Sequence, residues 1–356
     1  MADRGAYAEA GVDAAGAHGA LSGLVEVLRG IDTGKPARSV LKSGHYAAVL
    51  RLDDRTGLAL CTDGVGSKVI VAEQAGRFDT VGIDCVAMNV NDVICVGAEP
   101  IALVDYIAVE DAQPEMLRAI AVGLRAGAEQ AGVEIPGGEL AQLPELIRGH
   151  PSPSGFDLCA SCVGLVPLDR IVTGAAIQPG DALIGLPSSG VHSNGLTLAR
   201  NVLGDLSETP PELAGRTVAD ELLEPTTIYV RAVMELLGTD VDVRGLAHIT
   251  GDGFLNLTRL EADVGYRIDS PLPVPPVFRL IAQRGHVEEA ELWEVFNMGC
   301  GFVVVVPAAD ADGAVALLGK HHPGATVIGE ATDRGGLVEL PQAGLAGRKD
   351  QGFRTA

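Results

Sequence analysis

The spacing of apolar residues along this chain switches repeatedly between the two-residue period of strands and the 3.6-residue period of helices. Short apolar runs bounded by turn residues predict strands at 57–62, 101–109, 133–135, 157–166, 181–186, 302–306, 326–330 and 337–340. Longer periodic stretches predict helices at 69–74, 79–96, 114–131, 194–203, 227–237, 254–260 and 308–318. Alternation of this kind is typical of an α/β or α+β protein.

A glycine- and proline-containing stretch at 174–180 separates the two halves of this pattern. It contains no long flexible linker, so the two halves are expected to pack directly against each other. We therefore predict an N-terminal domain at 1–172, a C-terminal α+β domain at 173–345 and a short tail at 346–356.

The predicted helix 79–96 carries apolar residues around its whole circumference, which indicates that it is largely buried. It nevertheless contains the polar residues Asp84, Asn89, Asn91 and Asp92. At about 100° per residue, Asp84 and Asn91 lie within about 20° of each other around the helix. A carboxylate buried without a partner is strongly unfavourable, so the two aspartates need either a metal cation or a buried Arg or Lys.

Composition narrows the classes of function. The chain has 356 residues, of which 47% are hydrophobic, enough for one or two domains with real cores. Its net charge of −21, with no Lys/Arg-rich block, argues against nucleic acid and anionic membranes as partners. Residues 1–10 lack the pattern of a signal peptide, and no apolar run is long enough to span a membrane. Six cysteines in or beside apolar runs are expected to be structural thiols of a cytoplasmic protein.

The segment TDGVGSK, at 62–68, lies between a predicted strand and a predicted helix. A glycine-rich turn at a helix start exposes backbone N–H groups that bind phosphate. It is not a Walker A loop, because one residue rather than four separates Gly64 from Gly66. The Asp63 carboxylate would repel a bare phosphate, so a bridging Mg²⁺ is predicted, with an ordinary capped turn as the alternative. Asp105, in a later apolar strand, could join the same acidic cluster.

Three further segments combine glycines with polar side chains. GGE at 137–139 would let a ligand approach the backbone and add a carboxylate, or would be a plain turn. SSGVHSNG at 188–195 offers hydroxyl and N–H groups suited to a monophosphate or ribose, although His192 could equally be a capping or surface residue. HITGDG at 248–253 starts with a histidine that could move a proton near neutral pH.

Taken together, these segments resemble the phosphoribosylformylglycinamidine cyclo-ligase family of purine biosynthesis, also called aminoimidazole ribonucleotide synthetases, with this chain as a divergent member. The matching segments, in family order and spacing, are YAEAGVD at 7–13, TDGVGSK at 62–68, GIDCVAMNVNDVICVGAEP at 82–100, GGELAQLP at 137–144, SSGVHSNG at 188–195, HITGDG at 248–253 and FNMGCG at 296–301. The chain departs from the family at three places: SGHYA at 43–47 replaces a GGFG-type loop, GGELAQLP replaces GGETAEMP, and GDG at 251–253 replaces three glycines.

The resemblance implies a two-domain fold in which the mixed sheet of the N-terminal domain pairs across a homodimer. It also implies ring closure of formylglycinamidine ribonucleotide to aminoimidazole ribonucleotide, with ATP and Mg²⁺. In this reaction the γ-phosphoryl group activates the formamide oxygen, which is otherwise a poor leaving group. Such chemistry depends on positioning and charge neutralisation more than on a protein nucleophile.

Roles for individual residues combine this resemblance with the reading of the residues themselves. Metal ligands are expected at Asp63, Asp84, Asp92 and Asp105. Nucleotide contacts are expected at Asp63, Gly64, Gly66, Ser67, Lys68, Asn91, Gly137, Gly138 and Glu139. Substrate contacts are expected at Ser189, Gly190, His192, Ser193, Asn194, Thr250 and Gly251. Catalytic roles are expected for His248, as the proton-transfer group, and for Asp92 and Lys68.

Several ATP-using enzymes with the same fold are alternatives: thiamine-monophosphate kinase, selenophosphate synthetase, the hydrogenase maturation dehydratase and the amidotransferase-linked synthetase of the preceding step. Residues 351–356 contain no cysteine of the hydrogenase-factor type, and no cysteine stands in an N-terminal glycine-rich loop as selenium chemistry favours. A non-catalytic nucleotide-binding subunit is an alternative of another class. The buried acids and His248 argue against it, because a scaffold has no need of them.

Overall fold

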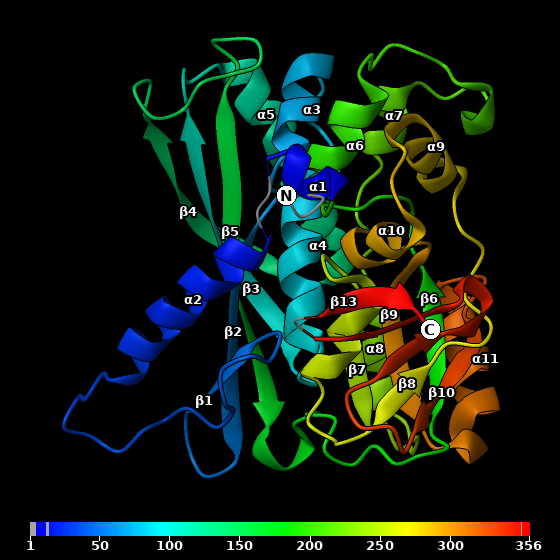
Figure 1. Ribbon diagram of the computed structural model, residues 1–356. Coiled ribbons are helices and arrows are strands. Elements are labelled where there is room, and N and C mark those ends of the chain that lie inside the picture. The colour runs from blue at the N-terminus through cyan, green and yellow to red at the C-terminus, as the bar shows by residue number, and fades with distance from the viewer. Residues whose placement is uncertain (1–4, 12–13, 350) are drawn as a thin grey trace.

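The computed structural model describes residues 5–11, 14–349 and 351–356, and contains two sheets on either side of the central helix α4 (Figure 1). The first half contains α1 (Ala6–Glu9), α2 (Ala14–Arg29), β1 (Ala48–Arg51), β2 (Thr56–Gly64), α3 (Lys68–Ala75), α4 (Val81–Ile94), β3 (Glu99–Val109), α5 (Pro114–Ala131), β4 (Glu134–Gln142) and β5 (Phe156–Pro167). The expectation of an α/β architecture with two sheet-containing halves is confirmed.

The five strands of the first sheet lie in the order β1-β2-β5-β3-β4. All neighbours are antiparallel except β3 and β4, which are parallel, so the sheet is mixed as predicted. Burial alternates strictly along β5, which shows that one face of the sheet is covered and the other is not. Helix α4 contacts β2 and β5 on the covered face.

Helices α4 and α5 approach each other closely because glycines line their contact. A Cβ atom on Gly82 would lie 2.2 Å from the backbone nitrogen of Leu124, and one on Gly127 would lie 2.9 Å from Cβ of Val86. Helix α5 also follows its predicted boundaries residue for residue, with Pro114 at its first position and Gly132 in the left-handed conformation after its end. This packing fixes α4, which carries the polar residues of interest.

The second half contains an eight-stranded sheet in the order β13-β12-β11-β8-β10-β6-β9-β7. Its strands are β6 (Ala182–Pro187), β7 (Gly245–His248), β8 (Gly265–Arg267), β9 (Cys300–Val306), β10 (Thr326–Thr332), β11 (Val338–Leu340), β12 (Leu345–Arg348) and β13 (Gly352–Thr355). Its helices are α6 (Leu196–Leu203), α7 (Val218–Leu222), α8 (Val230–Leu237), α9 (Pro276–Gly285), α10 (Glu289–Val295) and α11 (Ala311–His321). Every residue of β9 is buried, so this strand lies at the centre of the second core.

Three expectations change with the structure. The GGE segment at 137–139 is not a turn after a short strand, because β4 runs through it and pairs with β3. The predicted helix at 254–260 is a 3₁₀ helix, Gly253–Arg259, named η3. The residues set apart as a tail at 346–356 contribute β12 and β13 to the second sheet, where β12 pairs with β11.

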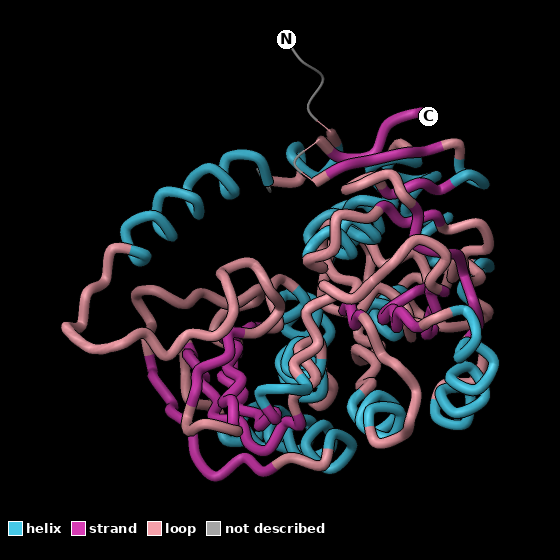
Figure 2. The backbone as a smooth tube through the Cα atoms, turned by 90° about the horizontal axis from the view of Figure 1, so that it is seen from below, coloured by secondary structure: helices cyan, strands magenta, loops and turns pink. Residues whose placement is uncertain are grey.

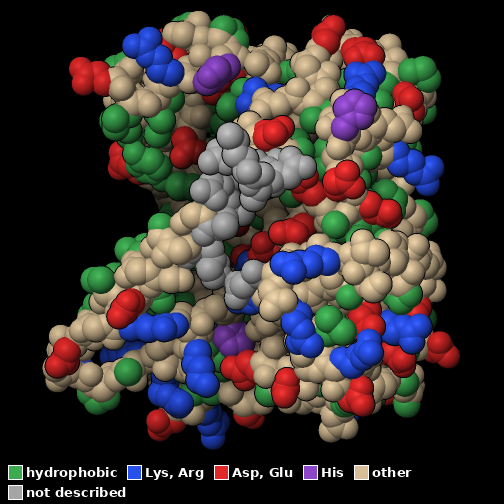
Figure 3. All heavy atoms as spheres, viewed as in Figure 1, with side chains coloured by type: hydrophobic (Ala, Val, Ile, Leu, Met, Phe, Trp, Pro, Cys, Tyr) green, Lys and Arg blue, Asp and Glu red, His purple; other side chains and the backbone are tan. Residues whose placement is uncertain are grey.

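Helix α2, which the sequence pattern did not predict, stands away from the rest of the molecule (Figure 2). Several of its large apolar side chains are exposed, namely Leu21, Leu24, Val27 and Leu28. Hydrophobic side chains also gather on the first-sheet side of the hollow beside α2 (Figure 3). Among the described residues, no helix combines the length and apolar character that crossing a membrane requires.

Candidate functional site

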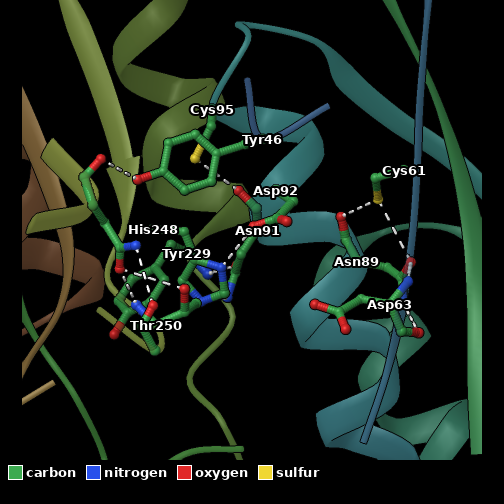
Figure 4. Close-up of polar contacts among 12 residues, drawn as sticks. Tyr46, Cys61, Asp63, Asn89, Asn91, Asp92, Cys95, Tyr229, His248 and Thr250 are labelled. Carbon is green, nitrogen blue, oxygen red and sulfur yellow. Dashed lines mark hydrogen bonds and ion pairs between the residues drawn. The ribbon is translucent and has the colours of Figure 1, made fainter. Parts of the chain in front are cut away.

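Polar side chains from distant parts of the chain meet along one helix, α4, between the two sheets (Figure 4). Asp63 comes from the end of β2, and His248 comes from the end of β7. Helix α4 contributes Asn89, Asn91 and Asp92 between them. The structure therefore brings together three of the segments that the sequence analysis selected: 62–68, 82–100 and 248–253.

Asn89 fixes the position of Asp63, a role that the sequence analysis did not assign. The backbone N–H of Asp63 donates to Asn89 Oδ1 at 3.1 Å, and Asn89 Nδ2 donates to the Asp63 carbonyl at 3.0 Å. The amide of Asn89 thus pairs with the end of β2 as a neighbouring strand would. The Asn89 side chain is fully buried, and its Nδ2 also donates to the Cys85 carbonyl at 2.9 Å.

The Asp63 carboxyl is partly buried and lies in the field of a second acid. Burial raises its pKa above the ordinary value, and the negative charge of Asp92 raises it further, although the N–H of Gly64 opposes both effects. That N–H donates to Asp63 Oδ1 at 2.7 Å. A carboxyl whose pKa is raised by burial and by a neighbouring acid lies in a site that a cation would stabilise.

Asp92 and His248 form the second part of this site. The Nδ1 atom of His248 lies 2.9 Å from Asp92 Oδ1. The imidazole has no exposed surface, whereas 17% of the Asp92 side chain is exposed. Of the two groups, the Asp92 carboxylate is therefore the one with surface that a ligand can contact.

Asn91 determines which nitrogen of His248 carries the proton. Its Nδ2 donates to the Thr227 carbonyl at 2.9 Å, and its Oδ1 accepts from the Tyr229 N–H at 3.0 Å, so the orientation of its amide is fixed. The same Nδ2 faces His248 Nε2 at 3.5 Å. A donor facing Nε2 assigns the proton of the neutral ring to Nδ1, which then donates to Asp92.

Asp84 has a different environment, in which the carboxylate is paired within the protein. Its Oδ1 accepts from Lys68 Nζ at 2.9 Å and from the Thr226 N–H and hydroxyl, both at 2.7 Å. Lys68 also donates to the Glu224 carbonyl at 2.6 Å, and the side chains of Lys68 and Asp84 are both fully buried. Lys68, expected to contact phosphate, therefore has its ammonium group inside the protein. For Asp84, the buried lysine pair given as the alternative to a metal is present.

The shared face of Asp84 and Asn91 is confirmed, because both contact the same loop of the second half. Asp84 accepts hydrogen bonds from Thr226. Asn91 contacts the next part of the same loop, at the Thr227 carbonyl and the Tyr229 N–H. Ser193 adds a further hydrogen bond to Asp84 Oδ1 at 3.2 Å. Polar groups of α4 thus join the two halves of the molecule.

His192 lies inside the protein and supports its own loop. Its Nε2 accepts from the Ser189 N–H at 3.1 Å and from the Thr227 N–H at 3.4 Å, and its side chain is nearly fully buried. Burial lowers its pKa well below the usual value, and His248 and Lys68 lower it further. In this position the imidazole holds the backbone of the loop and does not face the solvent, where a substrate would enter.

Strand register places Asp105 with the acids and Glu139 away from them. Asp63 and Asp105 both pair with Ala160, from opposite sides, so they lie on the same face of the sheet with Cα atoms about 10 Å apart. Gly138 pairs with Asp105 on that face, where a Cβ atom would collide with the Asp105 carboxylate. Glu139 is one residue further, so its side chain lies on the opposite, uncovered face.

Three of the other predicted positions make hydrogen bonds to neighbouring segments. Ser67 accepts from the Thr197 hydroxyl at 2.8 Å, which joins the 62–68 turn to α6. The Thr250 N–H donates to Asn256 Oδ1 at 2.7 Å, and Ser189 donates to the Pro225 carbonyl at 2.5 Å. The remaining positions lie in the same segments: Gly64, Gly66, Gly137, Gly190, Asn194 and Gly251.

Two further residues at this site were absent from the predictions. Tyr46, in the SGHYA loop, is buried and donates to the Asn256 carbonyl at 3.1 Å. The Arg259 guanidinium lies over the Tyr46 ring, 4.9 Å from its centroid. Arg259 is the last residue of η3, which starts at the end of the HITGDG segment. Its closeness in sequence to that segment could have identified it as a site residue.

The carboxylates at this site suit a metal ion that is held partly by the protein and partly by the phosphates of a bound substrate. Among the described residues, no group of three or more His, Cys, Asp or Glu side chains could hold a metal ion unaided. Mg²⁺ commonly binds through one or two carboxylates and the phosphates of a substrate. The Asp63 and Asp92 carboxylates fit that pattern, and the buried Oδ2 of Asp84, which has no partner within the described structure, is a further acceptor nearby on α4.

Comparison with known proteins identifies the family. The N-terminal domain of AIR synthase related proteins matches residues 44–166, and the C-terminal domain matches residues 178–340. The phosphoribosylformylglycinamidine cyclo-ligase of Methanothermobacter thermautotrophicus is 52% identical over 340 residues, covering 94% of this chain and 96% of that protein. The protein of the same name from Pyrococcus furiosus is 45% identical, covering 93% and 96%.

Solved structures agree on the fold. The hydrogenase maturation protein HypE in complex with ATP superimposes with a TM-score of 0.61 at 20% identity, covering 89% of this chain and 90% of that one. The thiamine-monophosphate kinase from Stenotrophomonas maltophilia gives a TM-score of 0.61 at 20% identity, covering 86% and 92%. At such low identity these likenesses concern the fold alone, whereas the cyclo-ligases match in sequence over nearly the whole length. The chain belongs to the AIR synthase related family and, within it, to the phosphoribosylformylglycinamidine cyclo-ligases.

Proposed function

We propose that this protein is an ATP-dependent cyclo-ligase that closes the imidazole ring of formylglycinamidine ribonucleotide to give aminoimidazole ribonucleotide, ADP and phosphate. The observation that carries the proposal is 52% identity, over 94% of the chain, to a protein named for this reaction. The meeting of the acidic and glycine-rich segments at α4 supports it, because ATP-driven ring closure needs a phosphate site beside a polar substrate site.

The reaction proceeds by activation of an oxygen that cannot leave unaided. The γ-phosphoryl group of ATP is transferred to the formamide oxygen, and the amidine nitrogen then attacks the same carbon. The C–O bond breaks, phosphate leaves, and the attacking nitrogen loses a proton. We assign the removal of that proton to the exposed Asp92 carboxylate, with His248 orienting it through Nδ1.

Asp63 and Asp92 are the residues that we propose to hold Mg²⁺ together with the ATP phosphates. The ion, when bound, would supply positive charge to the transferring phosphoryl group. The backbone of the 62–68 turn, held by Asn89 and by the contact of Ser67 with Thr197, presents N–H groups to the same phosphates. The 188–195 loop and the backbone at Thr250 and Gly251 would form the ribonucleotide side of the site.

The uncovered face of the first sheet supports a homodimer. Val104, Tyr106 and Leu165 are each at least 37% exposed there, and a sheet normally buries such a face against another element. A second copy of the same face would cover it symmetrically. Sedimentation of the purified protein measures the predicted dimer directly. All six cysteines are free thiols, which suits a reducing compartment such as the cytoplasm.

Release of ADP by the purified protein tests the proposed reaction. We expect ADP to form with ATP, Mg²⁺ and formylglycinamidine ribonucleotide, and to stay at background when the ribonucleotide is omitted. Detection of aminoimidazole ribonucleotide in equal amount would confirm that hydrolysis is coupled to ring closure. ADP formation that ignores the ribonucleotide would overturn the proposal.

A further inference from the structure

The proposed ATP site carries more negative than positive charge near the phosphates. Asp63 and Asp92 lie there, whereas the ammonium group of Lys68 is enclosed with Asp84. The whole chain has a net charge of −21, so its overall field does not attract ATP. A triphosphate binding at these acids therefore needs a local cation from the protein in addition to a metal ion.

Arg259 lies where such a cation is needed. It ends η3, which follows Asp252, and 30% of its side chain is exposed. It lies over the ring of Tyr46, whose hydroxyl donates to the Asn256 carbonyl, and the Asn256 side chain in turn accepts from the Thr250 N–H, two residues after His248. Its Nη2 is 3.7 Å from Asp252 Oδ2, which is beyond hydrogen-bond distance, so this ion pair does not fix the guanidinium in a two-pronged contact.

The aromatic ring of Tyr46 holds the guanidinium in place. The ring centroid is 4.9 Å from Arg259 Cζ, a cation–π contact that places the guanidinium over the ring and leaves its N–H groups for a ligand. Tyr46 is itself anchored by its hydrogen bond to the Asn256 carbonyl. His45, one residue earlier, contacts Glu261 at 3.1 Å, so the 43–47 loop is tied to both sides of the end of η3.

This anchoring gives a physical reason for the SGHYA sequence of the loop. A glycine-rich loop would contact a ligand through its backbone N–H groups, and its glycines would leave the chain flexible. Here His45 and Tyr46 direct their side chains into the second half. The loop thereby becomes a support for a charged side chain.

We propose that Arg259, stacked on Tyr46, binds the triphosphate of ATP at the Asp63–Asp92 site. The guanidinium presents a planar fork of donors that matches phosphate oxygens. Tyr46 acts as a positioning residue, which orders this fork before ATP binds. The inference rests on the proposed function, because it needs ATP at this site.

Direct binding measurements with matched variants test the assignment. Arg259→Gln removes the charge and Arg259→Lys keeps it without the fork, and Arg267→Gln removes a partly exposed arginine of the second sheet as a control. A non-hydrolysable ATP analogue and adenosine are titrated separately at constant Mg²⁺. We expect Arg259→Gln to weaken the analogue roughly tenfold to a hundredfold, Arg259→Lys to weaken it less, and adenosine affinity to stay unchanged in all three.

The results of these titrations distinguish a failure of the Arg259 assignment from a failure of the proposed function. Equal loss for the analogue and adenosine would assign Arg259 to the structure of the site and overturn the inference. Unchanged analogue affinity in Arg259→Gln would also overturn it, while leaving the proposed function intact. A wild-type protein that binds no analogue would overturn the proposed function itself. Tyr46→Leu, which removes the ring, is expected to bind the analogue several-fold more weakly, and Tyr46→Phe, which keeps the ring but loses its hydrogen bond to Asn256, is expected to lose less affinity than Tyr46→Leu.

Discussion

Helix α4 carries two acidic sites whose charges are compensated in different ways. Asp84 is fully buried, and one of its oxygens accepts hydrogen bonds from Lys68, Thr226 and Ser193. Asp92 is partly exposed, and its carboxylate is paired with the His248 ring. Its negative charge raises the pKa of Asp63. The two sites lie only two helical turns apart on the same element.

The way in which each carboxylate is paired distinguishes a structural aspartate from a ligand-binding one better than the residue type does. A buried carboxylate such as Asp84, with a lysine and several donors on one oxygen, has its charge compensated within the protein, so it joins the two halves and leaves only its Oδ2 atom for a ligand. The Asp63 carboxyl, whose pKa is raised by burial and by the charge of Asp92, would instead be stabilised in its charged form by a cation.

Lys68→Met is expected to lower the free energy of unfolding by about 3–5 kcal/mol, because it leaves the Asp84 charge buried without its ion pair. Urea unfolding of the purified variant measures the change. Adding Asp84→Asn should recover a large part of the loss, since the double variant buries no charge. If Lys68→Met lost as little unfolding free energy as Arg267→Gln, which removes an exposed ion pair, the Lys68–Asp84 pair would not be the structural contact described above.

Asp92→Asn is expected to reduce the rate of ADP release roughly 10²–10⁴-fold while leaving the unfolding midpoint close to that of the wild type. The asparagine keeps the shape of the side chain and still accepts from His248 Nδ1, but it carries no charge and cannot take a proton. Steady-state rates with ATP and the ribonucleotide supply the measurement. A variant with the wild-type rate would remove Asp92 from the chemistry.

Local features of the sequence predicted the elements well. Helix α5 matched its predicted ends because Pro114 and Gly132 act on their own turns. The common face of Asp84 and Asn91 followed from helical geometry alone, which requires no knowledge of the partner. The meeting of 62–68 with 248–253 came from the family resemblance and not from the pattern.

The sequence pattern could not predict which residues from distant segments would contact each other. Lys68 is 156 residues from the Glu224 carbonyl that it contacts, and nothing local distinguishes a buried lysine from a phosphate-binding one. The face of the sheet on which Glu139 lies was not predictable, because it depends on how far β4 extends and on its register with β3. Asn89 looked like the other polar residues of α4, and only the position of β2 shows that its amide pairs with Asp63.

Asn89→Ala is expected to cost about 1–3 kcal/mol of stability, because the buried N–H and carbonyl of Asp63 lose their partners. The displaced Asp63 should also weaken Mg²⁺-dependent ATP turnover, seen as a higher Mg²⁺ concentration at half-maximal rate. Cys85→Ala is a matched control, one turn away on α4, that leaves the Asp63 contacts in place. A similar shift of the Mg²⁺ dependence in both variants would contradict a specific role for Asn89.

Asp63→Asn is expected to make the ligand-free protein slightly more stable at neutral pH, the opposite sign from the other variants. The folded-state pKa of Asp63 is raised above 3.8, so the folded protein holds this proton more firmly than the unfolded chain does. Below 3.8 the carboxyl is protonated in both states and has no effect. As pH rises through the raised pKa, the charge forms in the folded site and stability is lost.

Asparagine keeps the Oδ1 acceptor for the Gly64 N–H and removes that loss. The stability difference between variant and wild type should therefore grow from about zero near pH 3.5 to its full value above the raised pKa. Thermal unfolding of both proteins across this range measures it. Mg²⁺ and an ATP analogue should stabilise the wild type more than the variant, which reverses the order. A variant less stable than the wild type at every pH, without ligand, would mean that Asp63 is satisfied within the protein, and the distinction between the two acidic sites would fail.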